Sequence, residues 1–144
     1  MSNRNVQNTV FALRGDDSVE GGDAADLLYG ALGNDSLDGQ RGNDRLYGAG
    51  GDDRIIGAGN RDTLFGASGD DVLRAGFFAG AIGIDENRDT AFGGSGNDRI
   101  FGEGQRDTLY GGDGNDTLHG DEKPQFLNLE ANDTLFGDSG TDLL

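Results

Sequence analysis

The stretch Gly93-Gly94-Ser95-Gly96-Asn97-Asp98-Arg99-Ile100-Phe101 decides how this chain folds, because imperfect copies of it fill almost all of the remaining sequence. Gly111-Gly112-Asp113-Gly114-Asn115-Asp116-Thr117-Leu118-His119 is the clearest second copy. Both follow the pattern G-G-x-G-x-D-x-U-x, where U is a large aliphatic residue. Tandem copies at a fixed offset predict a repeat architecture in which each copy packs against its neighbours.

An aspartate occupies the sixth position of each copy, and an apolar residue follows two positions later. The aspartates form a ladder with two breaks: Asp17, Asp26, Asp35, Asp44, Asp53, Asp62, Asp71, Asp89, Asp98, Asp107, Asp116, Asp133 and Asp142. Each copy therefore predicts a glycine-rich turn followed by a three-residue strand. In that strand the apolar residue points inward and its two neighbours point outward.

This pattern resembles the RTX (haemolysin-type) calcium-binding nonapeptide-repeat family over roughly residues 12–144. The resemblance implies an all-β fold: a right-handed parallel β-roll, a solenoid with two short-stranded parallel sheets. Two copies would make one turn, and about six turns at about 4.8 Å spacing would form a stack about 30 Å long. We expect residues 1–11 to form an N-terminal lead-in or cap, and residues 12–144 to form the roll, with inserted loops at about 75–83 and 120–128.

Treating the two breaks as loops places alternate copies on the same edge of the roll. The first edge then contains Asp17, Asp35, Asp53, Asp71, Asp98, Asp116 and Asp142, each with a glycine two residues earlier. The second edge contains Asp26, Asp44, Asp62, Asp89, Asp107 and Asp133, where that glycine survives only at Gly42. The alternative treats residues 75–83 as a degenerate repeat with Ile82 pointing inward. It mixes the two edges, so the loop interpretation is preferred.

The aspartate rows indicate calcium, which binds six to eight hard oxygen ligands with flexible geometry. A row of carboxylates repels itself without counter-ions, although a single aspartate could simply cap its own turn. The family resemblance implies that an ion lies between successive turns of one edge, bound by the sixth-position aspartates and by backbone carbonyls. We favour the first edge as the metal site and regard the second edge as weaker. The absence of Cys and the single His argue against soft metals.

Arginines precede three aspartates of the second edge. These are Arg61, Arg88 and Arg106. A guanidinium pairs well with a carboxylate, so they are candidate substitutes for calcium there; the alternative is that they simply point into solvent.

An aromatic residue follows the inward residue in the strands after each second-edge turn. The row is Tyr29, Tyr47, Phe65, Phe92, Tyr110 and Phe136. It predicts a continuous aromatic strip on one outer sheet face, which either rigidifies the sheet or forms an interface. The candidate occupants are the inserted loops, a second copy of the chain, or a carbohydrate or other surface ligand.

Composition narrows the function. The chain has 144 residues, 28 Gly, no Cys and a formal net charge of −16. Such acidity argues against nucleic acid and anionic membranes as partners. So few hydrophobic residues and so much charge predict a chain that is largely disordered without calcium and folds when calcium binds. No signal peptide is recognisable, so secretion, by type I export, is implied only by the family.

The favoured function is a calcium-binding module, part of or related to a secreted bacterial RTX protein. The alternative is a ligand-, surface- or ice-binding module that uses the aromatic and threonine face. We expect no enzyme, because no nucleophile–base pair is recognisable and His119 occupies an outward strand position. The last repeat runs to Leu144 without a recognisable cap, which is compatible with a fragment, an end-to-end assembly or a small stand-alone protein.

Overall fold

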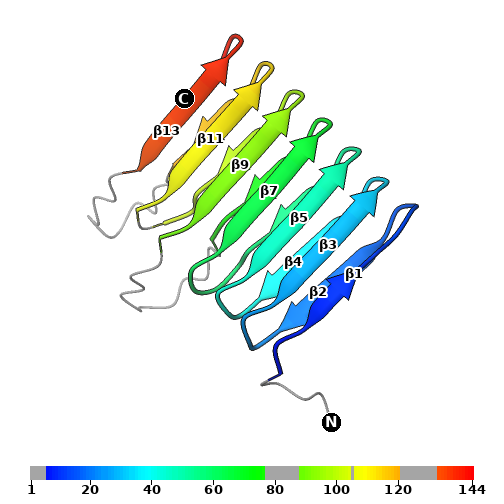
Figure 1. Cartoon of the computed structure of the whole chain (residues 1–144). Helices are drawn as coiled ribbons and strands as arrows, with labels where there is room; N and C mark the ends of the chain where they lie inside the picture. Colours follow the sequence, from blue (N-terminus) through cyan, green and yellow to red (C-terminus); the bar gives the residue numbers. More distant parts are fainter. Residues whose placement is uncertain (1–5, 77–87, 105, 121–132) are drawn as a thin grey trace.

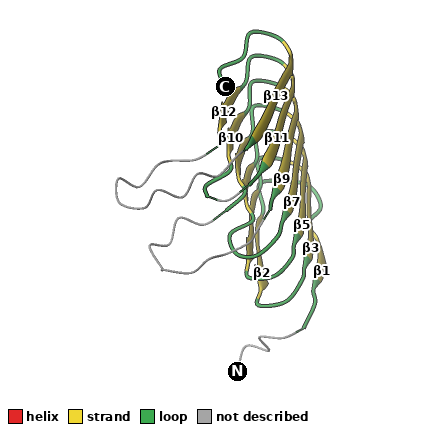
Figure 2. Cartoon of the chain, turned by 90° about the vertical axis from the view of Figure 1, so that its left-hand side faces the viewer, coloured by secondary structure: helices red, strands yellow, loops and turns green. Residues whose placement is uncertain are grey.

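The computed structural model describes residues 6–76, 88–104, 106–120 and 133–144, and this part of the chain forms a solenoid of two parallel sheets that face each other (Figures 1 and 2). The first sheet has seven strands, in the order β1 (Thr9–Phe11), β3 (Leu27–Leu32), β5 (Arg45–Gly50), β7 (Thr63–Ser68), β9 (Thr90–Ser95), β11 (Thr108–Asp113) and β13 (Thr134–Ser139). The second sheet has six, in the order β2 (Ser18–Gly22), β4 (Ser36–Gln40), β6 (Arg54–Ile56), β8 (Val72–Arg74), β10 (Arg99–Phe101) and β12 (Thr117–His119). The predicted all-β roll with two short-stranded parallel sheets is confirmed.

The strand register shows how the roll continues on either side of the two breaks in the repeat. Leu64 in β7 pairs directly with Ala91 in β9, and Leu109 in β11 pairs with Leu135 in β13. The division into two edges therefore continues across both breaks, and the degenerate-repeat alternative is wrong. The inserted segments themselves, expected at about 75–83 and 120–128, lie almost entirely outside the described residues, and Ile82 is among those not described.

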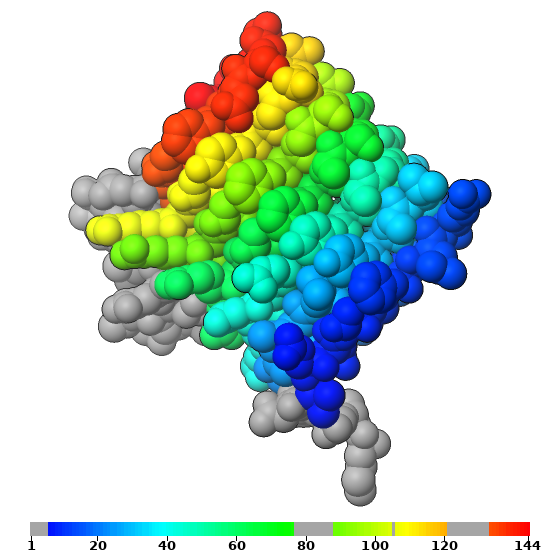
Figure 3. Space-filling view, in the orientation of Figure 1, coloured from blue at the N-terminus to red at the C-terminus, as the bar shows by residue number. Residues whose placement is uncertain are grey.

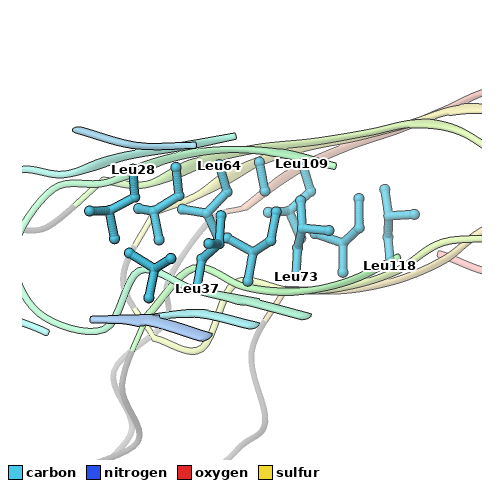
Figure 4. Close-up of a cluster of buried hydrophobic side chains, with 11 residues drawn as sticks. Leu28, Leu37, Leu64, Leu73, Leu109 and Leu118 are labelled. Atoms are coloured by element: carbon cyan, nitrogen blue, oxygen red, sulfur yellow. The ribbon is translucent and has the colours of Figure 1, made fainter. Parts of the chain in front are cut away.

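The core is one column of aliphatic side chains between the sheets. Leu28, Leu64 and Leu109 point inward from the first sheet toward Leu37, Leu73 and Leu118 of the second (Figure 4). Eleven buried residues form this cluster; apart from Val19 and Leu118 they have no exposed surface. The alternating burial along each strand produces it, because neighbouring side chains in a strand point to opposite faces.

Residues 9–11, which the sequence assigned to the lead-in, form β1. Val10 pairs with Leu28 and Phe11 with Tyr29. The first sheet therefore begins one strand earlier than the repeat pattern indicates.

The turns that connect the sheets are called rungs below; each contains one sixth-position residue. The preceding or next rung always means the neighbouring turn on the same edge of the roll. Close approach between successive rungs requires glycine at the fourth position of the first edge. At Gly33, where φ is 133°, an added Cβ would overlap the carbonyl group of Gly15 in the preceding rung. Any larger residue would push the rungs apart. None of the described residues belongs to a helix that could cross a bilayer.

Candidate metal centre

The sixth-position aspartates are buried along both edges. All ten from Asp26 to Asp116 have at most 3% of their surface exposed, and the end members Asp17, Asp133 and Asp142 are half-buried. In every one of them except Asp17, one carboxylate oxygen, Oδ1, accepts a hydrogen bond from the backbone N–H of the sixth-position residue in the preceding rung of the same edge. Asp53 N–H, for example, donates to Asp71 Oδ1 at 2.8 Å, and Asp71 N–H donates to Asp98 Oδ1 at 2.9 Å. The aspartates thus join rungs to each other rather than capping their own turns.

The other carboxylate oxygen, Oδ2, is buried without a hydrogen-bond partner within the described part of the chain. This holds for Asp26, Asp35, Asp44, Asp53, Asp62, Asp71, Asp98 and Asp116. A buried anionic oxygen without a donor is costly, because nothing replaces the water that it lost. Its recurrence in rung after rung indicates a ligand that approaches the same atom in each gap.

A glycine makes room for this oxygen. A Cβ at Gly21 would lie 2.6 Å from Asp26 Oδ2 and 2.6 Å from the carbonyl oxygen of Gly39 in the next rung. At Gly93 a Cβ would overlap Asp98 Oδ2 and lie 2.5 Å from the carbonyl oxygen of Gly111. A carboxylate oxygen and a carbonyl oxygen thus converge where the missing side chain would be, and both are ligand types that calcium prefers.

The buried surroundings of these carboxylates disfavour their charged form. Burial raises the pKa of Asp44, Asp53 and Asp98 from 3.8 to about 6, and that of Asp71 to about 7. For Asp62 burial raises the pKa to about 9, with the neighbouring carboxylate of Asp89 adding to the effect. The hydrogen bond from the preceding rung lowers each pKa but does not compensate. A cation in the gap would remove this penalty, so the donor set and its charge fit calcium.

Both edges share this geometry. The unpartnered Oδ2 atoms occur on the favoured first edge (Asp35, Asp53) and on the second edge (Asp26, Asp44), although the second edge has lost most of its fourth-position glycines. Within the described residues no cluster of three or more His, Cys, Asp or Glu side chains is arranged to bind a metal. A bound ion would therefore take several ligands from backbone carbonyls.

The arginines proposed as calcium substitutes are all exposed. Arg61 joins the rung through its backbone, whose N–H donates to Asn43 Oδ1 at 3.1 Å. Exposure of Arg61, Arg88 and Arg106 favours the interpretation that they point into solvent.

Sequence reasoning missed a second, exposed ladder on the first edge. Its members occupy the fifth position, and the N–H of each later rung donates to the side chain of the earlier one. The ladder contains Asp16, Asn34, Asp52, Asp70, Asn97, Asn115 and Thr141. The signal was present in the sequence, because this position is Asp or Asn in all but the last rung. The second edge places Arg61, Arg88 and Arg106 at the same position, where no oxygen can accept such a bond.

The aromatic row forms a stack along the first sheet. It comprises the six predicted residues and Phe11, with ring centroids 4.7 to 5.1 Å apart and ring planes within 11° of parallel. Each interior ring therefore uses both of its faces on its neighbours, and only ring edges point outward. Figure 3 shows side chains in bands parallel to the strands across the molecule.

His119 is exposed and stacks on Phe101 at 5.2 Å, in agreement with its predicted outward position. The guanidinium of Arg74 lies 5.2 Å from the centre of the Phe101 ring and pairs with Glu103 at 3.0 Å. These contacts give His119 a packing role on the outer face of the second sheet.

Comparison with known families agrees with the geometry. One family model matches, described as the RTX calcium-binding nonapeptide repeat, in four copies that cover residues 7–37, 38–73, 85–122 and 130–144. No curated protein and no solved structure shows significant similarity to the chain.

Proposed function

Because the chain belongs to the RTX calcium-binding nonapeptide-repeat family, we propose that it is a calcium-responsive module whose folding is driven by calcium ions in the gaps between its rungs. The observation that carries this proposal is the row of buried, unpartnered Oδ2 atoms. At most of these positions the oxygen lies beside a backbone carbonyl of the next rung, as at Asp26 and Gly39.

On the first edge the ions would be held by Asp17, Asp35, Asp53, Asp71, Asp98, Asp116 and Asp142, together with carbonyl oxygens of the glycine-rich segments. On the second edge they would be held by Asp26, Asp44, Asp62, Asp89, Asp107 and Asp133. Calcium supplies positive charge to carboxylates that have lost their water. The Oδ1 atoms remain in the hydrogen-bond ladder, so the ladder and the ions hold the same rungs together in different ways.

The net charge of −16 supports a dependence of folding on calcium. Without ions, the folded state must bury a row of carboxylates, whereas the unfolded chain leaves them in water. Ions that bind only the folded state shift the equilibrium toward it. The module would act without catalysis and outside the cell, where calcium is abundant; the link to secretion rests on the family.

Circular dichroism tests the proposal. The chain is freed of metal with a chelator and then titrated with calcium, and calorimetry counts the ions bound. We expect a change from a largely disordered spectrum to a β spectrum. Magnesium at the same concentrations should act weakly, because it requires near-octahedral geometry and gives up water reluctantly. A β spectrum that is the same with and without calcium would argue strongly against the proposal.

The stacked rings argue against the carbohydrate-binding alternative, since sugars pack on the open face of an aromatic ring and the interior rings of this stack offer only edges.

A further inference from the structure

We propose that the two end faces of the roll bind each other, so that copies of this chain associate head to tail, with β13 of one copy pairing with β1 of the next. This contact between two copies is called the joint below. It would extend both sheets and both edges from one copy into the next. It rests on the proposed function in one respect: the gap created on the first edge, between Asp142 and the next copy's Asp17, would be a further calcium site.

Exposed apolar surface is concentrated at the ends. The large hydrophobic side chains that are exposed in the described residues lie toward the two ends: Val6, Phe11 and Leu13 in the first turn with Leu32 in the second, and Phe136, Leu143 and Leu144 in the last. Figure 1 places β1 and β13 at opposite ends of the stack. Scattered exposed hydrophobic residues are ordinary, but a concentration at the two ends indicates an interface.

The aromatic stack is complementary at its ends. Phe11 and Phe136 are its terminal members, and each has a neighbouring ring on one side only. They are 64% and 41% exposed. If β13 pairs with β1 in the register that the other strands keep, Phe136 lies against Phe11 of the next copy. The same register places Leu135 beside Val10, two inward residues that are only partly buried in the single chain.

The hydrogen-bond ladder is also complementary. In the interior, the backbone N–H of each aspartate donates to the carboxylate one rung later, as Asp116 donates to Asp142 Oδ1 at 3.0 Å. Among the described residues, Asp142 N–H has no acceptor and the carboxylate of Asp17 has no N–H donor. One joint would satisfy both groups. The ends of one chain thus offer opposite halves of the same contact, which is the condition for an open, heterologous assembly.

Two end-blocked variants test the direction of association. Phe11→Lys blocks one end and Phe136→Lys the other, and Ser68→Lys adds the same charge at an exposed site in the middle of the roll. With calcium present, analytical ultracentrifugation should show concentration-dependent oligomers for the unchanged chain and for Ser68→Lys. Each end-blocked variant alone should be monomeric. An equimolar mixture of the two should form a heterodimer, because one free end of each kind remains.

Directed cross-linking provides a second test that does not depend on a charged substitution. The chain has no cysteine. A chain carrying both Thr9→Cys and Thr134→Cys should form a covalent ladder of oligomers on oxidation, because the proposed register places these positions opposite each other. Thr63→Cys with Thr134→Cys should not. Circular dichroism of every variant in calcium identifies any that fails to fold.

The outcomes separate the two proposals. A chain that is folded in calcium but sediments as a monomer at all concentrations would overturn the joint and leave calcium binding intact. Homodimers of a single end-blocked variant would also overturn it, because they require like ends to meet. Head-to-tail association that persists without calcium would support the joint and count against the proposed function.

Discussion

The backbone N–H of Asp62 donates to Asp89 Oδ1 at 2.8 Å, although 27 residues separate them rather than the 18 found between most rungs. The insertion between these two rungs leaves the hydrogen bond as short as that in an uninterrupted part, such as Asp17 to Asp35 at 2.8 Å. The ladder therefore depends on which rungs are neighbours in space and is insensitive to the length of chain between them.

Metal-free protein should gain structure in acid. The pKa values of Asp44, Asp53 and Asp98 are raised to about 6 in the folded state, above the ordinary value of 3.8. The folded state therefore binds more protons than the unfolded state between about pH 4 and pH 6, so the free energy of unfolding falls as pH rises through that window. Lowering the pH from 7.5 to 4.5 without calcium should increase the β signal in circular dichroism. A flat or decreasing signal would contradict the raised pKa values.

Asp71→Asn should remove one calcium site while keeping the hydrogen bond from Asp53, because the amide retains an acceptor oxygen at the Oδ1 position. Calorimetry should show one ion fewer, and the calcium midpoint of folding should rise roughly two- to tenfold, since one of several ions is lost. Without calcium the same variant should be more stable than the unchanged chain, because it no longer buries that charge.

The matched control for that variant is Asp70→Asn. Asp70 is exposed and belongs to the fifth-position ladder, where Asn34 and Asn97 already occupy equivalent positions. Its calcium midpoint should stay close to that of the unchanged chain. An equal effect of both substitutions would mean that only overall charge matters and that the Asp71 carboxylate has no specific role.

Gly93→Ala should close one gap. The added Cβ would overlap Asp98 Oδ2 and approach the carbonyl oxygen of Gly111. We expect a loss of stability of about 1–3 kcal/mol in calcium, the usual cost of forcing an atom into a packed site, and a loss of one ion. Gly59→Ala is the control, because its Cβ would come no closer than 3.4 Å to its nearest neighbour, the carbonyl oxygen of Gln40, at an ordinary φ. Thermal denaturation and calorimetry compare the two.

Phe92→Ala should destabilise the roll more than Phe136→Ala. Phe92 stacks on both Phe65 and Tyr110, at 5.1 and 4.8 Å, whereas Phe136 stacks on Tyr110 alone. Each aromatic contact contributes about 0.5–1.5 kcal/mol beyond the area that it buries, so the difference should be of that order. Thermal denaturation in saturating calcium, at concentrations where the chain is monomeric, measures it. Equal losses would show that the stack adds little to ordinary burial.

The period of the repeat made most of the fold predictable. Asp and aliphatic residues at fixed spacing indicate the two edges, and pairs such as Leu64 with Ala91 follow once the breaks are treated as loops. The first rung could not be recognised in the same way, because Asn8 replaces the aspartate and no glycine run precedes it. Its role emerges from the structure, where Asn8 N–H donates to Asp26 Oδ1 at 2.5 Å and Asn8 O accepts from Leu27 N–H at 2.9 Å.

The residues of the candidate metal centre were predictable, but the separate positions of their two carboxylate oxygens were not. The sequence indicates rows of carboxylates, yet it cannot show that Oδ1 and Oδ2 of one side chain serve different purposes. That division depends on the spacing between rungs, which brings a backbone N–H within 2.8 Å of Asp71 Oδ1 and leaves Oδ2 beside Gly66. Sequence alone likewise predicts an aromatic row, but only the orientation of the rings shows that their faces are already in use.

The sixth-position hydrogen bonds all run in one direction, which makes erosion of the roll asymmetric. Losing the turn that contains Asp142 leaves the N–H of Asp116 without its protein acceptor and open to water. Losing the turn that contains Asn8 takes only a donor from Asp26, whose carboxylate water can then solvate. Fraying from the β13 end therefore frees backbone donors of this ladder, whereas fraying from the β1 end frees carboxylate acceptors, and hydrogen exchange at the two ends measures which loss costs more.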